Sequence, residues 1–98
     1  MRSALLAVIV ALAVASAAAH EKFKIVGTIA ALKQDEIAIK SIDGSTYEID
    51  MNEKTAVMDR NRNKLSHADL KIGVKATVMA LGHDQFDLEA FEIQLTDR

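Results

Sequence analysis

Cysteine, proline and tryptophan are all absent from this chain of 98 residues, and its aromatic side chains are one tyrosine and three phenylalanines. Without cysteine, no disulfide can stabilise the fold and no thiol can act as a nucleophile. The missing cysteine also excludes a lipoprotein anchor behind the leader. A small domain of this kind depends on its hydrophobic core alone, which favours a compact closed architecture.

An apolar leader opens the chain. Arg2 supplies a positive charge, and residues 4–15 are an unbroken run of Ala, Leu, Val and Ile. A bilayer span needs about 20 such residues, whereas a basic start, a short apolar run and small residues at the −3 and −1 sites are typical of a secretory signal peptide. We predict that residues 1–19 are a signal peptide; a membrane anchor or a buried helix is the alternative. The candidate last residues of the leader are Ala17, Ala18 and Ala19.

The predicted mature chain, residues 20–98, is mildly acidic. Without Arg2 it has 11 Lys and Arg residues against 14 Asp and Glu residues, a net charge of −3. This balance gives no reason to expect nucleic acid or anionic lipid as a partner. We expect a periplasmic or secreted protein with no membrane span after signal removal. A small basic loop at Arg60, Arg62 and Lys64 is either solvated or contacts an acidic partner.

Apolar and polar residues alternate with period two along most of the mature chain, which indicates β-strands. Gly27 predicts a bulge or a sharp bend in the first strand, and Asp43-Gly44 predicts a type I′ hairpin turn. Ser66 and Asp69 have the spacing of a capping box around one helical turn. The expected extended segments are 23–32, 36–41, 46–51, 56–58, 74–81 and 88–95.

This element order predicts one all-β domain, a small five- to six-stranded OB-like Greek-key barrel with one short helical turn between strands three and four. The alternatives are a six-stranded up-and-down barrel or a small sandwich, if residues 56–58 pair independently. We expect most of the four aromatic residues to point into the core, which argues against the aromatic platform that OB barrels use for single-stranded nucleic acid.

Several short motifs carry a family resemblance: Gly27-Thr-Ile, the Asp43-Gly44 hairpin, Thr55 after the third strand, Asp69-Leu-Lys-Ile-Gly73 and Ala90-Phe-Glu-Ile93. With these motifs the mature chain resembles small exported bacterial domains of unknown function with an OB-like β-barrel. The resemblance implies the fold and the compartment and no established activity.

In size and layout the chain is also similar to the periplasmic copper- and silver-binding chaperones of metal efflux systems. Those proteins place a His, two Met and a Trp on the barrel strands. Tryptophan is missing here, and Tyr47, Ile49 and Met51 do not reproduce that set. The metal role is therefore not implied by this resemblance.

No residue pattern predicts catalysis. Ser66 and His67 are neighbours in a helical turn, where adjacent side chains point about 100° apart. The carboxylates of Glu48, Asp50, Glu89 and Glu92 fall on the outward phase of strands, which is typical of a solvated face. We expect no catalytic residues and no enzyme activity.

Histidine and methionine are the candidate metal ligands. His67 and His83 fall in loops, Met51 is in core phase, Met58 is a further thioether, and Met79 lies on the outward phase. None of these has a local spacing that would bring ligands together.

His20 is different, because cleavage after Ala19 would give it an α-amino group beside the imidazole. Cleavage after Ala17 would instead create an X-X-His motif that wraps Cu(II) in four nitrogens. His20 is therefore the one candidate metal residue, and copper the one candidate cofactor.

Three functions remain open from the sequence. The first is an exported, non-enzymatic binding or envelope-associated module with an unidentified ligand. The alternative is a periplasmic copper-binding carrier that uses the N-terminal His20. The third is a domain that binds a protein partner through an open edge of the barrel.

Overall fold

The computed structural model describes residues 21–97, so the predicted signal peptide and His20 lie outside the described residues. Seven strands and one 3₁₀ turn make up the described chain. They are β1 (Glu21–Leu32), β2 (Glu36–Ser41), β3 (Thr46–Asp50), β4 (Ala56–Asp59), β5 (Lys64–Leu65), η1 (His67–Asp69), β6 (Lys75–Gly82) and β7 (Leu88–Leu95).

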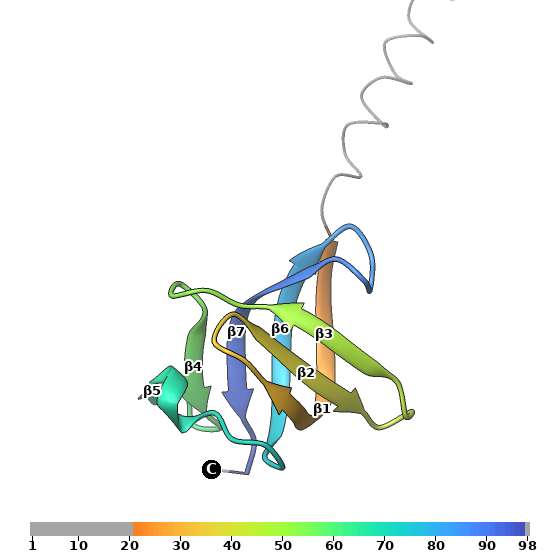
Figure 1. Ribbon diagram of the computed structural model, residues 1–98. Coiled ribbons are helices and arrows are strands. Elements are labelled where there is room, and N and C mark those ends of the chain that lie inside the picture. The colour runs from red at the N-terminus through yellow and green to blue at the C-terminus, as the bar shows by residue number, and fades with distance from the viewer. Residues whose placement is uncertain (1–20, 98) are drawn as a thin grey trace, which may run out of the picture.

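Five of these strands close into a barrel (Figure 1). Antiparallel pairing joins β3 to β2, β2 to β1, β1 to β6 and β6 to β7, and a single parallel pair, Asp50 with Glu89, closes the ring between β3 and β7. η1 lies between the third and fourth barrel strands. The prediction of a small all-β, OB-like barrel is confirmed.

The short segment β4 does not become a sixth strand of the barrel ring. It pairs in parallel with the second half of β7, from Ala56 with Glu92 to Asp59 with Leu95, and β5 pairs with β4. The outer edge of β7 is thus shared between β3 at its start and β4 at its end. This arrangement excludes the up-and-down barrel and the sandwich.

Aliphatic side chains fill the barrel. Ile37, Ile39, Ile49 and Ile93 are fully buried, as the period-two pattern predicts. The expectation that most aromatic residues lie in the core is wrong: Phe86 is 85% exposed, Phe91 is 39% exposed, and Phe23 and Tyr47 are half-buried. Met79 of β6 pairs with Glu92 of β7, and Ala80 pairs with Ala90, so Phe91 is an extra residue in β7. This register shift turns the Phe91 side chain away from the core.

Gly27 lies where β1 passes from its pairing with β6 to its pairing with β2. A Cβ atom at this position would lie 2.1 Å from the carbonyl oxygen of Lys40, so glycine permits a close approach of the β2 backbone. The bulge itself lies further along, between Ile29 and Ala31. The predicted bulge is therefore displaced from Gly27, which instead permits the close approach of the β2 backbone.

The β2–β3 hairpin forms where Asp43-Gly44 predicts it, but its turn is not type I′. The N–H of Gly44 donates to the carbonyl of Ser41, and Gly44 has a φ of +92°. Asp43 is not among the described non-glycine residues with positive φ, which a type I′ turn would require. A three-residue loop with glycine in the left-handed region replaces the two-residue turn.

The predicted capping interaction is present at η1. The carboxylate of Asp69 accepts hydrogen bonds from the backbone N–H of Ser66 at 2.9 Å and from its hydroxyl at 3.3 Å. Leu70, directly after the turn, is buried in the core.

Candidate functional site

A surface hollow of about 560 Å³ lies between the start of β3 and the loop that joins β6 to β7. We call it the β3-edge hollow. Its lining residues are Ser45, Thr46, Tyr47, Glu48, Gln85 and Phe86.

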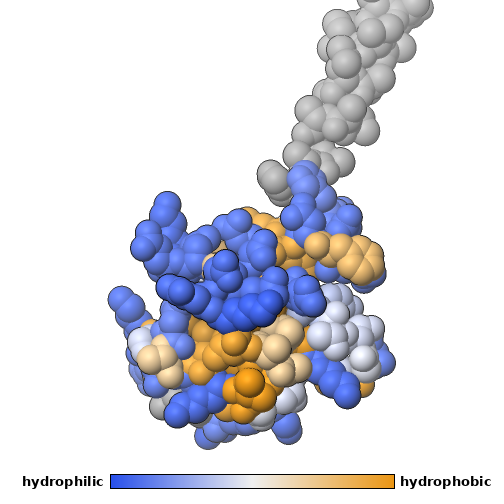
Figure 2. Space-filling view, viewed as in Figure 1, coloured by the Kyte–Doolittle hydropathy of each residue, from blue (hydrophilic) through white to orange (hydrophobic). Residues whose placement is uncertain are grey.

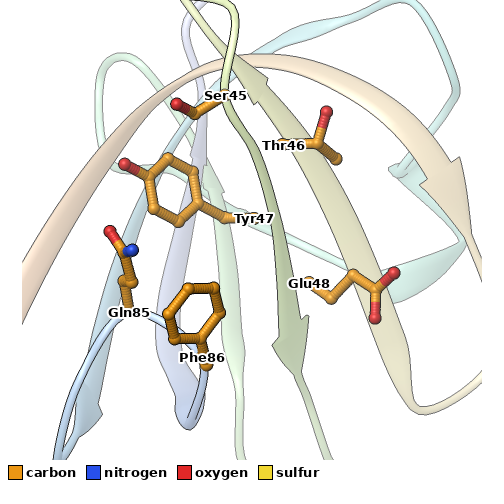
Figure 3. A pocket seen from close by; sticks show the side chains of 6 residues that line it. All are labelled: Ser45, Thr46, Tyr47, Glu48, Gln85 and Phe86. Carbon is orange, nitrogen blue, oxygen red and sulfur yellow. The ribbon is translucent and has the colours of Figure 1, made fainter.

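Two aromatic rings from distant parts of the chain face this hollow. Figure 3 shows Tyr47, Gln85 and Phe86 on one side of β3, with Thr46 and Glu48 on the other. Tyr47 is half-buried and is packed against the core, whereas Phe86 stands out into solvent. The carboxylate of Asp84 accepts the backbone N–H of Phe86 at 2.8 Å, which helps to hold the loop in shape.

The hollow lies beside an open stretch of sheet edge. The N–H of Ser41 donates to the carbonyl of Ser45, and the N–H of Met51 donates to the carbonyl of Asp35. Ser45 and Met51 flank β3, so the odd-numbered residues between them also direct their main-chain groups toward β2. The even-numbered residues Thr46 and Glu48 therefore direct theirs away from β2. Among residues 21–97, β7 pairs with β3 only at Asp50, so the edge beside Thr46 and Glu48 is open.

Acidic groups dominate the surroundings of this edge. Glu48, Asp50 and Glu89 project outward at the β3–β7 junction, and Asp84 and Asp87 lie in the β6–β7 loop; all five residues are exposed. Lys40, opposite Thr46 across the hairpin, is a nearby cation. Figure 2 shows a band of hydrophilic residues across the molecule where Figure 1 places β3, with hydrophobic surface above and below it.

Asp43 adds a further carboxylate at the turn that precedes β3. Its side chain accepts the backbone N–H of Ser45 at 2.9 Å. This hydrogen bond is the main cause that holds the pKa of Asp43 below its ordinary value. Asp43 is therefore an anion across the neutral range.

The candidate metal ligands do not converge. The Nε2 atom of His67 lies 2.8 Å from the carbonyl oxygen of Thr55, so it acts as a donor there and is not a free ligand atom. His83 lies in the β6–β7 loop, and Met51 is buried in the core as predicted. Within residues 21–97, no group of three His, Cys, Asp or Glu side chains is placed to hold a metal ion.

Ser66 and His67 do not form a nucleophile and base pair in this structure. The Ser66 hydroxyl donates to Asp69, and the His67 ring contacts Thr55. The carboxylates that the sequence places on outward phases are indeed outside: Glu48, Asp50 and Glu89 are exposed, and Glu92 is half-buried in an ion pair with Arg62 at 3.2 Å.

Arg62, from the predicted basic loop, thus bridges β7 and the β4–β5 connection. Its φ of +67° is unusual for a residue other than glycine. The basic loop is therefore held against the barrel by one of its own cations, Arg62, through the ion pair with Glu92.

Gln85 and Phe86 are site residues that the sequence patterns above do not predict. The available signal was a phenylalanine in a polar turn, His83-Asp-Gln-Phe-Asp87, where no strand phase could place it in the core. Its proximity to Tyr47 depends on barrel closure, which no local pattern encodes.

No helix in the described part of the chain is long and apolar enough to cross a membrane. Comparisons of the chain with protein-family models, curated proteins and solved structures give no match.

Proposed function

We propose that this protein is an exported, non-enzymatic binding module, associated with the cell envelope, which takes its partner in the β3-edge hollow. One observation carries the proposal. Phe86 holds a large aromatic ring in solvent beside the half-buried ring of Tyr47, at the mouth of a hollow. Exposed aromatic side chains of this kind are enriched where proteins bind partners.

The position of the hollow in the barrel supports this choice. OB barrels bind their ligands over strands two and three and the loop between strands four and five. The β6–β7 loop, with Gln85 and Phe86, joins the fourth and fifth barrel strands here.

The charge of the site argues against nucleic acid as the partner. Single-stranded nucleic acid binds to aromatic platforms that lie in a positively charged groove. Here Glu48 lines the hollow together with the aromatic pair, Asp84 and Asp87 flank Gln85 and Phe86 in the loop, and Asp50 and Glu89 line the neighbouring hollow. A phosphate backbone would be repelled at this edge.

Photo-crosslinking in cells tests the proposal. Phe86 is replaced by p-benzoylphenylalanine, and the same replacement at Ile72, which is 67% exposed, serves as the control. We expect a discrete adduct by mass spectrometry from position 86 and none from position 72. Equal, heterogeneous labelling at both positions would reject the hollow as a binding site.

The copper carrier remains an alternative that rests on His20 and its neighbours alone. Intact-mass spectrometry of the exported protein would establish whether the leader ends at Ala17, Ala18 or Ala19. A Cu(II) titration of that protein and of its His20→Ala variant follows, and equal affinity in the two would reject the carrier.

A further inference from the structure

The main chain of β3 limits what can lie in the β3-edge hollow. Thr46 and Glu48 direct their N–H and C=O groups toward it, away from β2, and among residues 21–97 no strand other than β2 pairs with these two residues. Two residues further along, Asp50 pairs with Glu89 of β7. The edge that β7 occupies at Asp50 is therefore continuous with an edge that can accept another strand.

The side chains around this edge differ on its two sides. Tyr47 and Phe86 lie on one side of β3, and Glu48 and Thr46 on the other (Figure 3). A strand laid beside β3 would place alternate side chains on these two sides. Apolar residues would then meet the aromatic rings, and basic residues would meet Glu48 and the neighbouring carboxylates.

We propose that the β3-edge hollow binds an extended segment of a partner protein as an added β-strand, in which basic and apolar side chains alternate. This inference rests on the proposed function, since it names the class of partner for the same site. Main-chain hydrogen bonds to Thr46 and Glu48 would supply affinity, and the two-sided pattern would supply specificity.

A second copy of this chain does not fit the same edge. Pairing of β3 with β3 of another copy would bring two acidic edges close together, since Glu48, Asp50 and Glu89 are exposed on each copy. Like charges directly opposite one another destabilise a strand pair. The acidic edge thus disfavours self-association and favours a basic segment.

Tyr47 gives a direct readout, because the chain has one tyrosine and no tryptophan. The probe is a hexapeptide of alternating Lys and Val with blocked ends, added to the purified protein. We expect a saturable change in Tyr47 fluorescence and slower hydrogen exchange of the Thr46 and Glu48 amides. A Glu-Val hexapeptide should give neither effect.

Two comparisons separate strand addition from simple charge attraction. N-methylation of alternate peptide residues removes the backbone N–H donors along one edge of the peptide and keeps its side chains. With this peptide, the exchange of the Thr46 and Glu48 amides should no longer be slowed. Glu48→Lys turns attraction into repulsion and should weaken binding about tenfold. Phe91→Ala, at an aromatic residue outside the β3-edge hollow, should bind like the wild type.

The outcomes distinguish this inference from the proposed function. Equal binding of the N-methylated peptide, or unchanged exchange at Thr46 and Glu48, would overturn strand addition. Binding of a soluble N-acetylglucosamine oligomer in place of the peptide would also overturn it and would leave the site intact. A crosslinked adduct at position 86 without any peptide binding would likewise overturn strand addition and keep the hollow as the binding site.

Discussion

At Gly27 a methyl group has no room, since the Lys40 carbonyl oxygen lies 2.1 Å from the place where Cβ would be. Gly27→Ala should therefore force β1 and β2 apart and cost about 2 kcal/mol or more in the free energy of unfolding. Urea unfolding measures this loss.

Gly44→Ala is the matched control, because Gly44 has open space around it and a φ of +92°. Its cost should be about 1 kcal/mol, from backbone conformation alone. Equal losses in the two variants would contradict the steric role of Gly27.

The carboxyl group of Asp43 should titrate at lower pH in the folded protein than in the urea-unfolded chain. The backbone N–H of Ser45 donates to it and lowers its pKa in the folded state. Because the folded pKa is the lower one, the interaction stabilises the hairpin above the unfolded pKa. This contribution is lost as the pH falls through the folded pKa.

Carbon-detected NMR of the Asp43 carboxyl measures both midpoints directly. Coincident midpoints in the folded and unfolded chains would show that the Ser45 hydrogen bond does not persist in solution. Asp43→Asn keeps an acceptor for the Ser45 N–H and should remove the contribution of the Asp43 carboxyl to the pH dependence of the Ser45 amide signal.

Among the elements, the connection from β3 to β4 depends on one buried hydroxyl. Thr55 is 3% exposed, and its Oγ1 donates to the Ala90 carbonyl at 2.8 Å and accepts the Asn52 N–H at 3.0 Å. The hydroxyl thereby ties this turn to β7. The threonine noted after the third strand thus has a structural reason.

Thr55→Val keeps the side-chain shape and leaves the Ala90 carbonyl and the Asn52 N–H without this partner. We expect a loss of about 1–3 kcal/mol in the free energy of unfolding. Thr55→Ser keeps the hydroxyl and should lose less. Thermal unfolding of both variants decides the point, and a valine variant as stable as the serine variant would refute it.

Strand positions could be predicted because alternation is a local signal, and Ile37, Ile39 and Ile49 are buried as that signal requires. Bulges were not predictable in the same way. An extra residue in one strand reverses which of the following residues point into the core. No residue pattern near Phe91 predicts the register shift opposite Met79 and Ala80. The candidate site was not predictable for a related reason, since it depends on the start of β3 and the β6–β7 loop meeting in the closed barrel.

For the molecule as a whole, barrel formation requires pairing between residues far apart in sequence, such as Glu21 with Gly82. Such long-range pairing makes refolding slow for the size of the chain, within about milliseconds to seconds. The absence of proline removes the isomerisation phase of about 10–100 s. The absence of cysteine removes any dependence of refolding on thiol–disulfide exchange.

Stopped-flow refolding of the purified protein should therefore show one exponential phase that carries the full amplitude. In double-jump experiments this phase should not change with the time spent unfolded. A slow phase that grows with that time would point to a process other than proline isomerisation and would contradict the prediction.

The arrangement of β1, β6 and β7 also determines how the molecule responds to force. β1 starts at Glu21, which pairs with Gly82 at the end of β6. β7 ends at Leu95, which pairs with Ala76 near the start of β6. Glu21 and Leu95 therefore lie at opposite ends of the barrel (Figure 1). Tension between Glu21 and Leu95 would slide β1 and β7 in opposite directions along β6. Every hydrogen bond of both ladders would then carry load at once, and the domain would resist extension until both ladders break together.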